Sequence, residues 1–98
     1  MKFMITWKFH PDKLHETLAK FAQMTPEQDE ALMGEDVKLI GRWHDLVRGR
    51  GVCIVETNNV EAVSRYSLNW NSAMELDTSV VLDDAETRAL GKSMNAEQ

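Results

Sequence analysis

The residues best suited to chemistry lie within the segment 41–59, GRWHDLVRGRGVCIVETNN. His44 carries an imidazole, which near neutral pH can act as a general acid, a general base or a ligand. Glu56 ends an apolar run, where a carboxylate either points to solvent, pairs with a cation or sits in a pocket. We therefore take His44 and Glu56 as the candidate catalytic residues.

Large side chains nearby would form the walls of a site for a small molecule. Trp43 precedes His44, and neighbours on a strand point to opposite faces of the sheet, so only one of the two can line a cavity between two sheets. Tryptophans such as Trp7 and Trp70 also fit ordinary core positions. The candidate ligand-binding residues are Trp43, Arg42, Trp7, Met4 and Thr6.

The sequence predicts neither a metal site nor a cofactor site. Its one cysteine, Cys53, allows no intrachain disulfide and no zinc site built on several thiolates. His10 and His15 lack the i, i+4 spacing that lets two histidines on a helix share a metal. The sequence contains no glycine-rich phosphate loop and no carboxylate pair at metal-binding spacing. We expect no metal and no cofactor.

The composition is that of one globular domain. The 98 residues, 43% of them apolar, suffice for a single core. A net charge of −5 argues against a nucleic-acid surface, because such surfaces concentrate Lys and Arg. No apolar run approaches the roughly 20 residues of a membrane span, and the first residues, MKFMITWKF, alternate like a strand rather than a signal peptide. We expect a cytoplasmic protein that binds neither nucleic acid nor membrane.

Four strands are predicted from the alternation and type of the side chains. Residues 2–9 alternate apolar with polar side chains, as in a sheet with one covered face. Two runs, 37–46 and 52–57, flank the turn residues 48–51 and form a central hairpin. β-branched residues predict a fourth strand over 76–82.

Helices are predicted between these strands. Apolar residues at helical spacing predict one helix over about 11–23, and another from an N-cap at Asn58 to about residue 71 with Tyr66 on its apolar side. Thr25 and the Gln three residues later form a capping box, which predicts a short helix over 26–33.

The end of the chain repeats this capping signal. Asp83 is followed three residues later by Glu86, which predicts a C-terminal helical tail over 83–98 whose last residues fray. Residues 1–82 then form the folded domain.

The order of these elements specifies an architecture. Right-handed crossovers in a β-α-β-β-α-β chain place both helices on one face of the sheet. The sequence therefore predicts an α+β, ferredoxin-like fold with a four-stranded antiparallel sheet. The other sheet face stays bare and carries apolar residues such as Met4 and Ile40, so we expect a second copy of the chain to cover it.

The register of the central hairpin decides the neighbours of Glu56, and two registers are considered. In one, Glu56 faces Arg42 and His44 faces Ile54. In the other, shifted by one residue, Glu56 shares a face with Trp43. An Arg42–Glu56 ion pair is the favoured expectation, ahead of a Glu56 in a pocket or in solvent.

Five segments carry a resemblance to a known family: KFMITWKFHPD, VKLIGRWHD, GRGVCIVETNN, the tryptophan of LNW and ELDTSVVLDDAE. Over roughly residues 1–88 they resemble the uncharacterised DUF3303 family, which is placed among the dimeric α/β barrels. The resemblance implies a homodimer whose two sheets close a barrel, and it implies no established activity. The Asn, Trp and His of the haem-degrading barrels are not matched, because Trp43 and His44 diverge and the first strand offers Thr6.

These observations lead to one expected function and two alternatives. We expect a homodimer that binds a small apolar or aromatic molecule between sheet and helices, with His44 or Glu56 as the polar contact. The first alternative is a cofactor-independent monooxygenase- or isomerase-like enzyme that uses His44 or Glu56 as its base. The second is a dimerisation module without a ligand.

Overall fold

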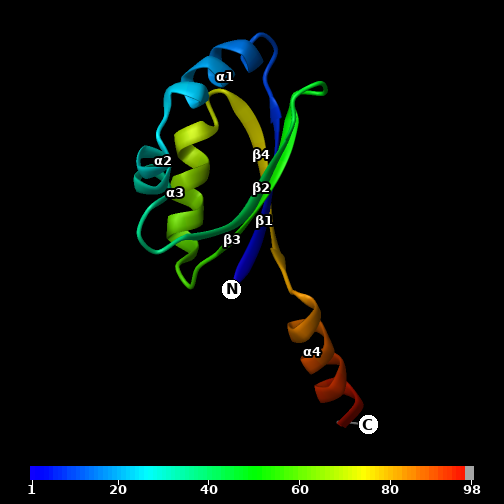
Figure 1. Cartoon of the computed structure of the whole chain (residues 1–98). Coiled ribbons are helices and arrows are strands. Elements are labelled where there is room, and N and C mark those ends of the chain that lie inside the picture. The colour runs from blue at the N-terminus through cyan, green and yellow to red at the C-terminus, as the bar shows by residue number, and fades with distance from the viewer. Residues whose placement is uncertain (97–98) are drawn as a thin grey trace.

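The computed structural model describes residues 1–96 (Figure 1). Its helices and strands are β1 (Lys2–Phe9), α1 (Leu14–Gln23), α2 (Pro26–Met33), β2 (Lys38–Asp45), β3 (Arg50–Glu56), α3 (Val60–Trp70), β4 (Met74–Val81) and α4 (Asp84–Ala96). The tail predicted over 83–98 is thus a helix as far as residue 96, and its predicted frayed end at 97–98 lies outside the described residues.

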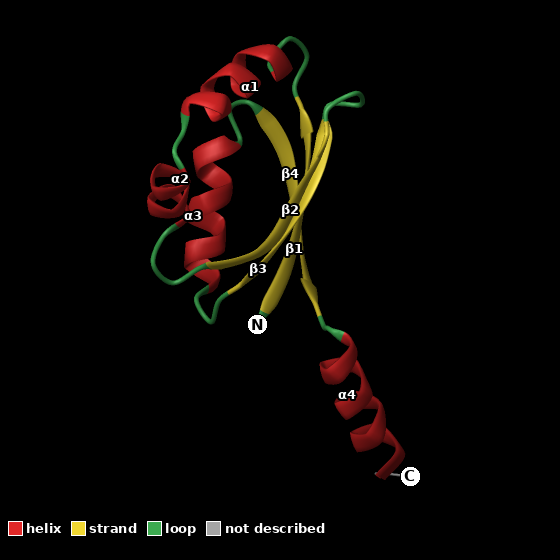
Figure 2. Cartoon of the chain, in the orientation of Figure 1, coloured by secondary structure: helices red, strands yellow, loops and turns green. Residues whose placement is uncertain are grey.

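The four strands form one antiparallel sheet in the order β2-β3-β1-β4 (Figure 2). Helices α1, α2 and α3 all lie on one face of this sheet, which we call the covered face. No other part of residues 1–96 packs on the opposite, open face in either figure. The α+β, ferredoxin-like architecture with a C-terminal helix is therefore confirmed.

The core lies between the covered face and the helices. On β1, the side chains of Phe3, Ile5 and Trp7 are buried and alternate with polar or half-buried neighbours, as the pattern of residues 2–9 predicted. Ile5 pairs with Cys53 of β3, and both are fully buried. Burial of a large apolar side chain contributes about 1.5–3 kcal/mol, so this strand pair anchors the fold.

Helix α1 begins at Leu14 and not near residue 11. Asp12 has a φ of 67°, a left-handed backbone that a helix cannot include, so residues 11–13 form a turn. The capping box of α2 is confirmed, because the Thr25 hydroxyl accepts from the Gln28 N–H at 3.1 Å while the Gln28 side chain accepts from the Thr25 N–H at 2.9 Å.

The N-cap predicted for α3 was wrong by one residue. The helix begins after Asn59 rather than Asn58. The Asn58 side chain instead accepts a hydrogen bond from the amino group of Met1, at 3.2 Å. A contact between residues so distant in sequence leaves no local signal.

A bulge at Ile40 sets the register of the central hairpin. Leu39 pairs with Val55 whereas Gly41 pairs with Ile54, so Ile40 is the extra residue. Beyond the bulge, Trp43 lies opposite Val52 on the open face. Alternate residues of a strand point to the same face, so Glu56, four residues after Val52 on β3, lies on the open face as well. Neither of the two predicted registers is the observed one, because Glu56 pairs with Lys38, but Glu56 does share a face with Trp43 as the second of them implied.

Two glycines make room for two indoles. A side chain at Gly51 would overlap the Trp7 ring on the covered face and the Trp43 carbonyl oxygen beside it. A side chain at Gly41 would overlap the ring of Trp43 on the open face. Each tryptophan ring therefore occupies space that a side chain at the neighbouring glycine would need.

Helix α4 extends away from the sheet beyond the end of β4 (Figure 1). Its predicted capping box is confirmed, because the Glu86 N–H donates to Asp83 at 2.8 Å and the Asp83 N–H donates to Glu86 at 3.1 Å. Leu90 and Met94 are more than half exposed on this helix. The described part of α4 therefore contributes little to the core.

We predict that Gly51→Ala destabilises the protein. The added methyl group must displace the buried Trp7 ring, which should lower the free energy of unfolding by about 1–3 kcal/mol in urea titrations. Gly91→Ala in α4 is the matched control, because nothing surrounds that glycine within 4 Å and alanine favours a helix. Equal stability of the two variants would contradict the proposed role of Gly51.

Candidate functional site

A small cavity lies between the covered face of the sheet and the helices α1 and α3. Its volume is about 50 Å³, room for one or two water molecules. Its aromatic and polar wall is made by Trp7, Phe21, Arg42, His44, Tyr66 and Trp70. Apolar side chains of α1 and β4 complete the wall, and a few polar groups reach the space from β2 and α3.

The structure separates the predicted site residues into two groups. Trp7, Arg42 and His44 line the cavity on the covered face. Met4, Thr6 and Trp43 lie on the open face, where Met4 pairs with Ile54 and Thr6 with Val52. Trp43 and His44 therefore do point to opposite faces, and His44 is the one that reaches the cavity on the covered face.

Arg42 is the best-anchored polar residue of the cavity. Its guanidinium makes two hydrogen bonds to the carboxylate of Asp29 on α2, at 2.6 and 3.3 Å, and one to the hydroxyl oxygen of Tyr66 on α3, at 3.3 Å. It also lies 5.1 Å from the centre of the Phe21 ring, within cation–π range. The expected Arg42–Glu56 ion pair was wrong, because Arg42 points to the covered face.

Burial and charge determine the protonation of this cluster. Burial alone would lower the pKa of Arg42, but the hydrogen bond to Asp29 and the contact with Tyr66 outweigh it and raise that pKa. Burial raises the pKa of the Tyr66 phenol and also that of the Cys53 thiol, to about 11. At neutral pH the Arg42 guanidinium is therefore charged, whereas the phenol and the thiol are neutral.

His44 lies at the rim of the cavity. Its ring meets Trp7 edge to face, with centroids 5.8 Å apart, and lies 5.4 Å from Phe21. Partial burial, and then the nearby Arg42 cation, lowers its pKa below the usual value of about 6.5. The imidazole is therefore neutral at pH 7, with one nitrogen able to donate and the other able to accept a hydrogen bond.

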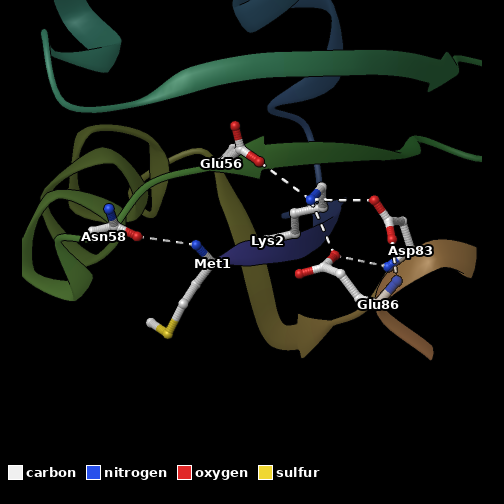
Figure 3. Close-up of polar contacts among 6 residues, drawn as sticks. All are labelled: Met1, Lys2, Glu56, Asn58, Asp83 and Glu86. Atoms are coloured by element: carbon white, nitrogen blue, oxygen red, sulfur yellow. Dashed lines mark hydrogen bonds and ion pairs between the residues drawn. The ribbon is translucent and has the colours of Figure 1, made fainter. Parts of the chain in front are cut away.

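Glu56 lies far from this chemistry, at the end of the open face. Its carboxylate pairs with Lys2 at 3.2 Å, and the same ammonium contacts Glu86 at 3.0 Å and Asp83 at 3.4 Å (Figure 3). Hydrogen bonds to Glu86 and Glu56 raise the pKa of Lys2. In this position Glu56 ties β3 to the start of α4.

Sequence reasoning missed two cavity residues, Tyr66 and Trp70. Both were assigned to the core of the helix, and both are buried there, at 5% and 9% exposure. Their spacing of four residues on α3 was the available signal, because it places the two rings on one helix face. The indole N–H of Trp70 has no hydrogen-bond acceptor among the residues that the structure describes.

The open face carries a second, shallower hollow of about 620 Å³. Trp43 and Val52 are among its apolar lining residues, and charged residues from all four strands surround it. Trp43 is 60% exposed there, an unusual position for so large an aromatic ring. The hollow is open to solvent in a single chain, and it is much larger than the cavity under α1.

No group of three or more His, Cys, Asp or Glu side chains within residues 1–96 is arranged to hold a metal ion. None of the helices described is both long and apolar enough to cross a membrane.

We predict that Asp29→Asn destabilises the protein strongly. The substitution leaves the Arg42 cation largely buried without its counter-charge, which typically costs about 3–5 kcal/mol of unfolding free energy. Asp84→Asn is the control, because Asp84 is 94% exposed and its 3.9 Å pair with Arg88 should contribute less than about 1 kcal/mol. Urea denaturation measures both, and a similar small loss in the two variants would contradict the role given to Asp29.

Comparison with known proteins places the chain in a family. A search of curated proteins found no match to this sequence. A family model described as a domain of unknown function, DUF3303, matches residues 1–95. This match covers nearly the whole chain, including every strand and helix that forms the cavity. The chain therefore belongs to the DUF3303 family.

Proposed function

We propose that the protein is a homodimer that binds a small apolar or aromatic molecule in the cavity between β1, β2, α1 and α3. The observation that carries the proposal is the unpaired indole N–H of Trp70, a buried residue in the wall of a mostly apolar cavity. Three residues predicted from the sequence, Trp7, Arg42 and His44, meet at the same cavity.

An unpaired buried donor is a reason to expect a ligand. Leaving such a group without a partner costs about 1–3 kcal/mol, and buried donors in folded proteins nearly always have an acceptor. None of the described residues 1–96 supplies an acceptor for the Trp70 indole. A bound molecule with a suitable atom would satisfy the indole and recover that energy.

Helix α1 limits the size of the ligand. Pockets for larger ligands measure roughly 300–1,000 Å³, so a volume of about 50 Å³ requires α1 to move outward when a ring system enters. This helix is weakly held, because Thr17 is its only buried residue and Leu18 is 38% exposed. His44 and Leu46 at the rim are exposed as well, and they mark the side of entry.

One observation favours the enzyme alternative. His44 is neutral at pH 7 and lies at the cavity rim, where a general base would meet an entering substrate. A cofactor-independent monooxygenase- or isomerase-like reaction would use this imidazole. Glu56 has no comparable position, because it lies on the other face of the sheet in an ion pair with Lys2. Turnover lost in His44→Gln with ligand affinity kept would favour the enzyme.

The open face supports the proposed dimer. Met4, Trp43, Val52 and Ile54 form an apolar strip across three strands, and a chain of this size gains stability when such a strip is covered. The flanks carry opposite charges, with Glu75 and Asp77 along β4 and Lys8 and Arg50 on β1 and β3. A two-fold arrangement of two sheets allows these charges to meet across the interface.

We predict that native mass spectrometry gives a mass twice the 11.2 kDa of the chain. Ile54→Lys, which places a charge in the middle of the apolar strip, should shift the protein to the monomer mass. Leu68→Lys is the control, because Leu68 is 67% exposed on α3 and lies on the other side of the molecule. A wild-type monomer at micromolar concentration would rule out the dimer.

We predict that naphthalene binds the protein and changes its tryptophan fluorescence. A Trp43→Phe background leaves Trp7 and Trp70, and both of these line the cavity. Thr17→Leu fills space at the cavity with extra methyl groups and should weaken binding at least about tenfold, a loss of about 1.4 kcal/mol.

Thr87→Leu on the exposed helix α4 is the matched control and should leave the affinity unchanged. Equal naphthalene affinity in the Thr17→Leu and Thr87→Leu proteins would show that the probe binds elsewhere.

A further inference from the structure

We infer that the ligand is an uncharged aromatic molecule with a carbonyl-type oxygen, and that Tyr66 and Trp70 donate hydrogen bonds to this oxygen. The inference rests on the proposed function, because it specifies the ligand of the same cavity. It depends on which polar atoms of the cavity remain available and on the charge that surrounds them.

The available polar atoms of α3 are donors. An indole nitrogen can donate a hydrogen bond and cannot accept one, so Trp70 requires an acceptor. The hydroxyl oxygen of Tyr66 already accepts from Arg42 at 3.3 Å, and the structure records no acceptor for its hydrogen within residues 1–96. Tyr66 and Trp70 are one turn apart on α3, so both rings face the same side of the helix.

The cavity offers no net positive charge to an anion. The Arg42 guanidinium is already neutralised by the Asp29 carboxylate, at 2.6 Å. His44 is neutral because burial and the Arg42 cation lower its pKa, and burial keeps Tyr66 protonated. A carboxylate ligand would have to leave water without a free cation to receive it, which is unfavourable. An uncharged acceptor oxygen has no such cost.

The aromatic side chains of the cavity wall favour a ligand with a planar ring. Trp7 and Phe21 both contact the His44 ring, in edge-to-face and tilted arrangements. Aromatic rings gain from such offset contacts beyond the area that they bury. A planar ligand between α1 and the sheet can contact these rings while its oxygen reaches α3.

The experiment compares three probes of nearly equal size on the dimer as purified: naphthalene, 2-acetylnaphthalene and 2-naphthoate. Affinities are measured by tryptophan fluorescence in the Trp43→Phe background and checked by calorimetry. We expect 2-acetylnaphthalene to bind about tenfold more tightly than naphthalene, as one or two added hydrogen bonds would give, and more tightly than 2-naphthoate.

Two variants test the named donors. Trp70→Phe and Tyr66→Phe each remove one donor and keep an aromatic ring, so each should reduce the ratio of ketone to naphthalene affinity several-fold. The ratio is the readout because a smaller ring also changes the space open to both probes. Thermal unfolding checks that each variant is folded, and the comparison of the three probes on the parent protein needs neither variant.

The outcomes separate this inference from the proposed function. Equal binding of naphthalene and 2-acetylnaphthalene would overturn the donor assignment and leave the apolar site intact. Tightest binding of 2-naphthoate would overturn the assignment of an uncharged ligand. Failure of all three probes to bind would overturn the inference together with the proposed function.

Discussion

The buried ion pair between Arg42 and Asp29 is the interaction on which the rest of the site depends. It joins β2 to α2, and the third hydrogen bond, to Tyr66, adds α3. Two charges removed from water are stable only when each has its partner, so the pair fixes the positions of three elements relative to one another. The pair also neutralises Arg42, the only Lys or Arg among the described residues that line the cavity. The other polar groups that the cavity presents, such as the His44 imidazole, are neutral.

The parts of the fold that the sequence predicted are those with local causes. The capping boxes at Thr25 and Asp83 join residues three apart, so their spacing alone defines where α2 and α4 begin. The alternation of residues 2–9 reports which side of one strand is buried. The order of strands and helices then leaves few ways to connect them, which is why the ferredoxin-like topology followed.

The features that could not be predicted join residues far apart in sequence. The bulge at Ile40 shifts the hairpin pairing, and no residue type in the segment predicts it. Arg42 lies on β2 and its partner Asp29 on α2, and only the folded chain shows that the two pair. Of the candidate site residues, Trp7, Arg42 and His44 converge because the strand register places them together, and register is a tertiary property.

Trp43 and His44 point to opposite faces of the sheet, so β2 contributes to both the open face and the cavity wall. His44 faces the cavity with a neutral ring, whereas Trp43 lies over Gly41 on the open face. Because Trp43 and His44 are consecutive residues of β2, a displacement of this strand moves the cavity wall and the open face together. A partner that displaced β2 from the open face would therefore also move His44 in the wall of the cavity, without any contact between that partner and the ligand.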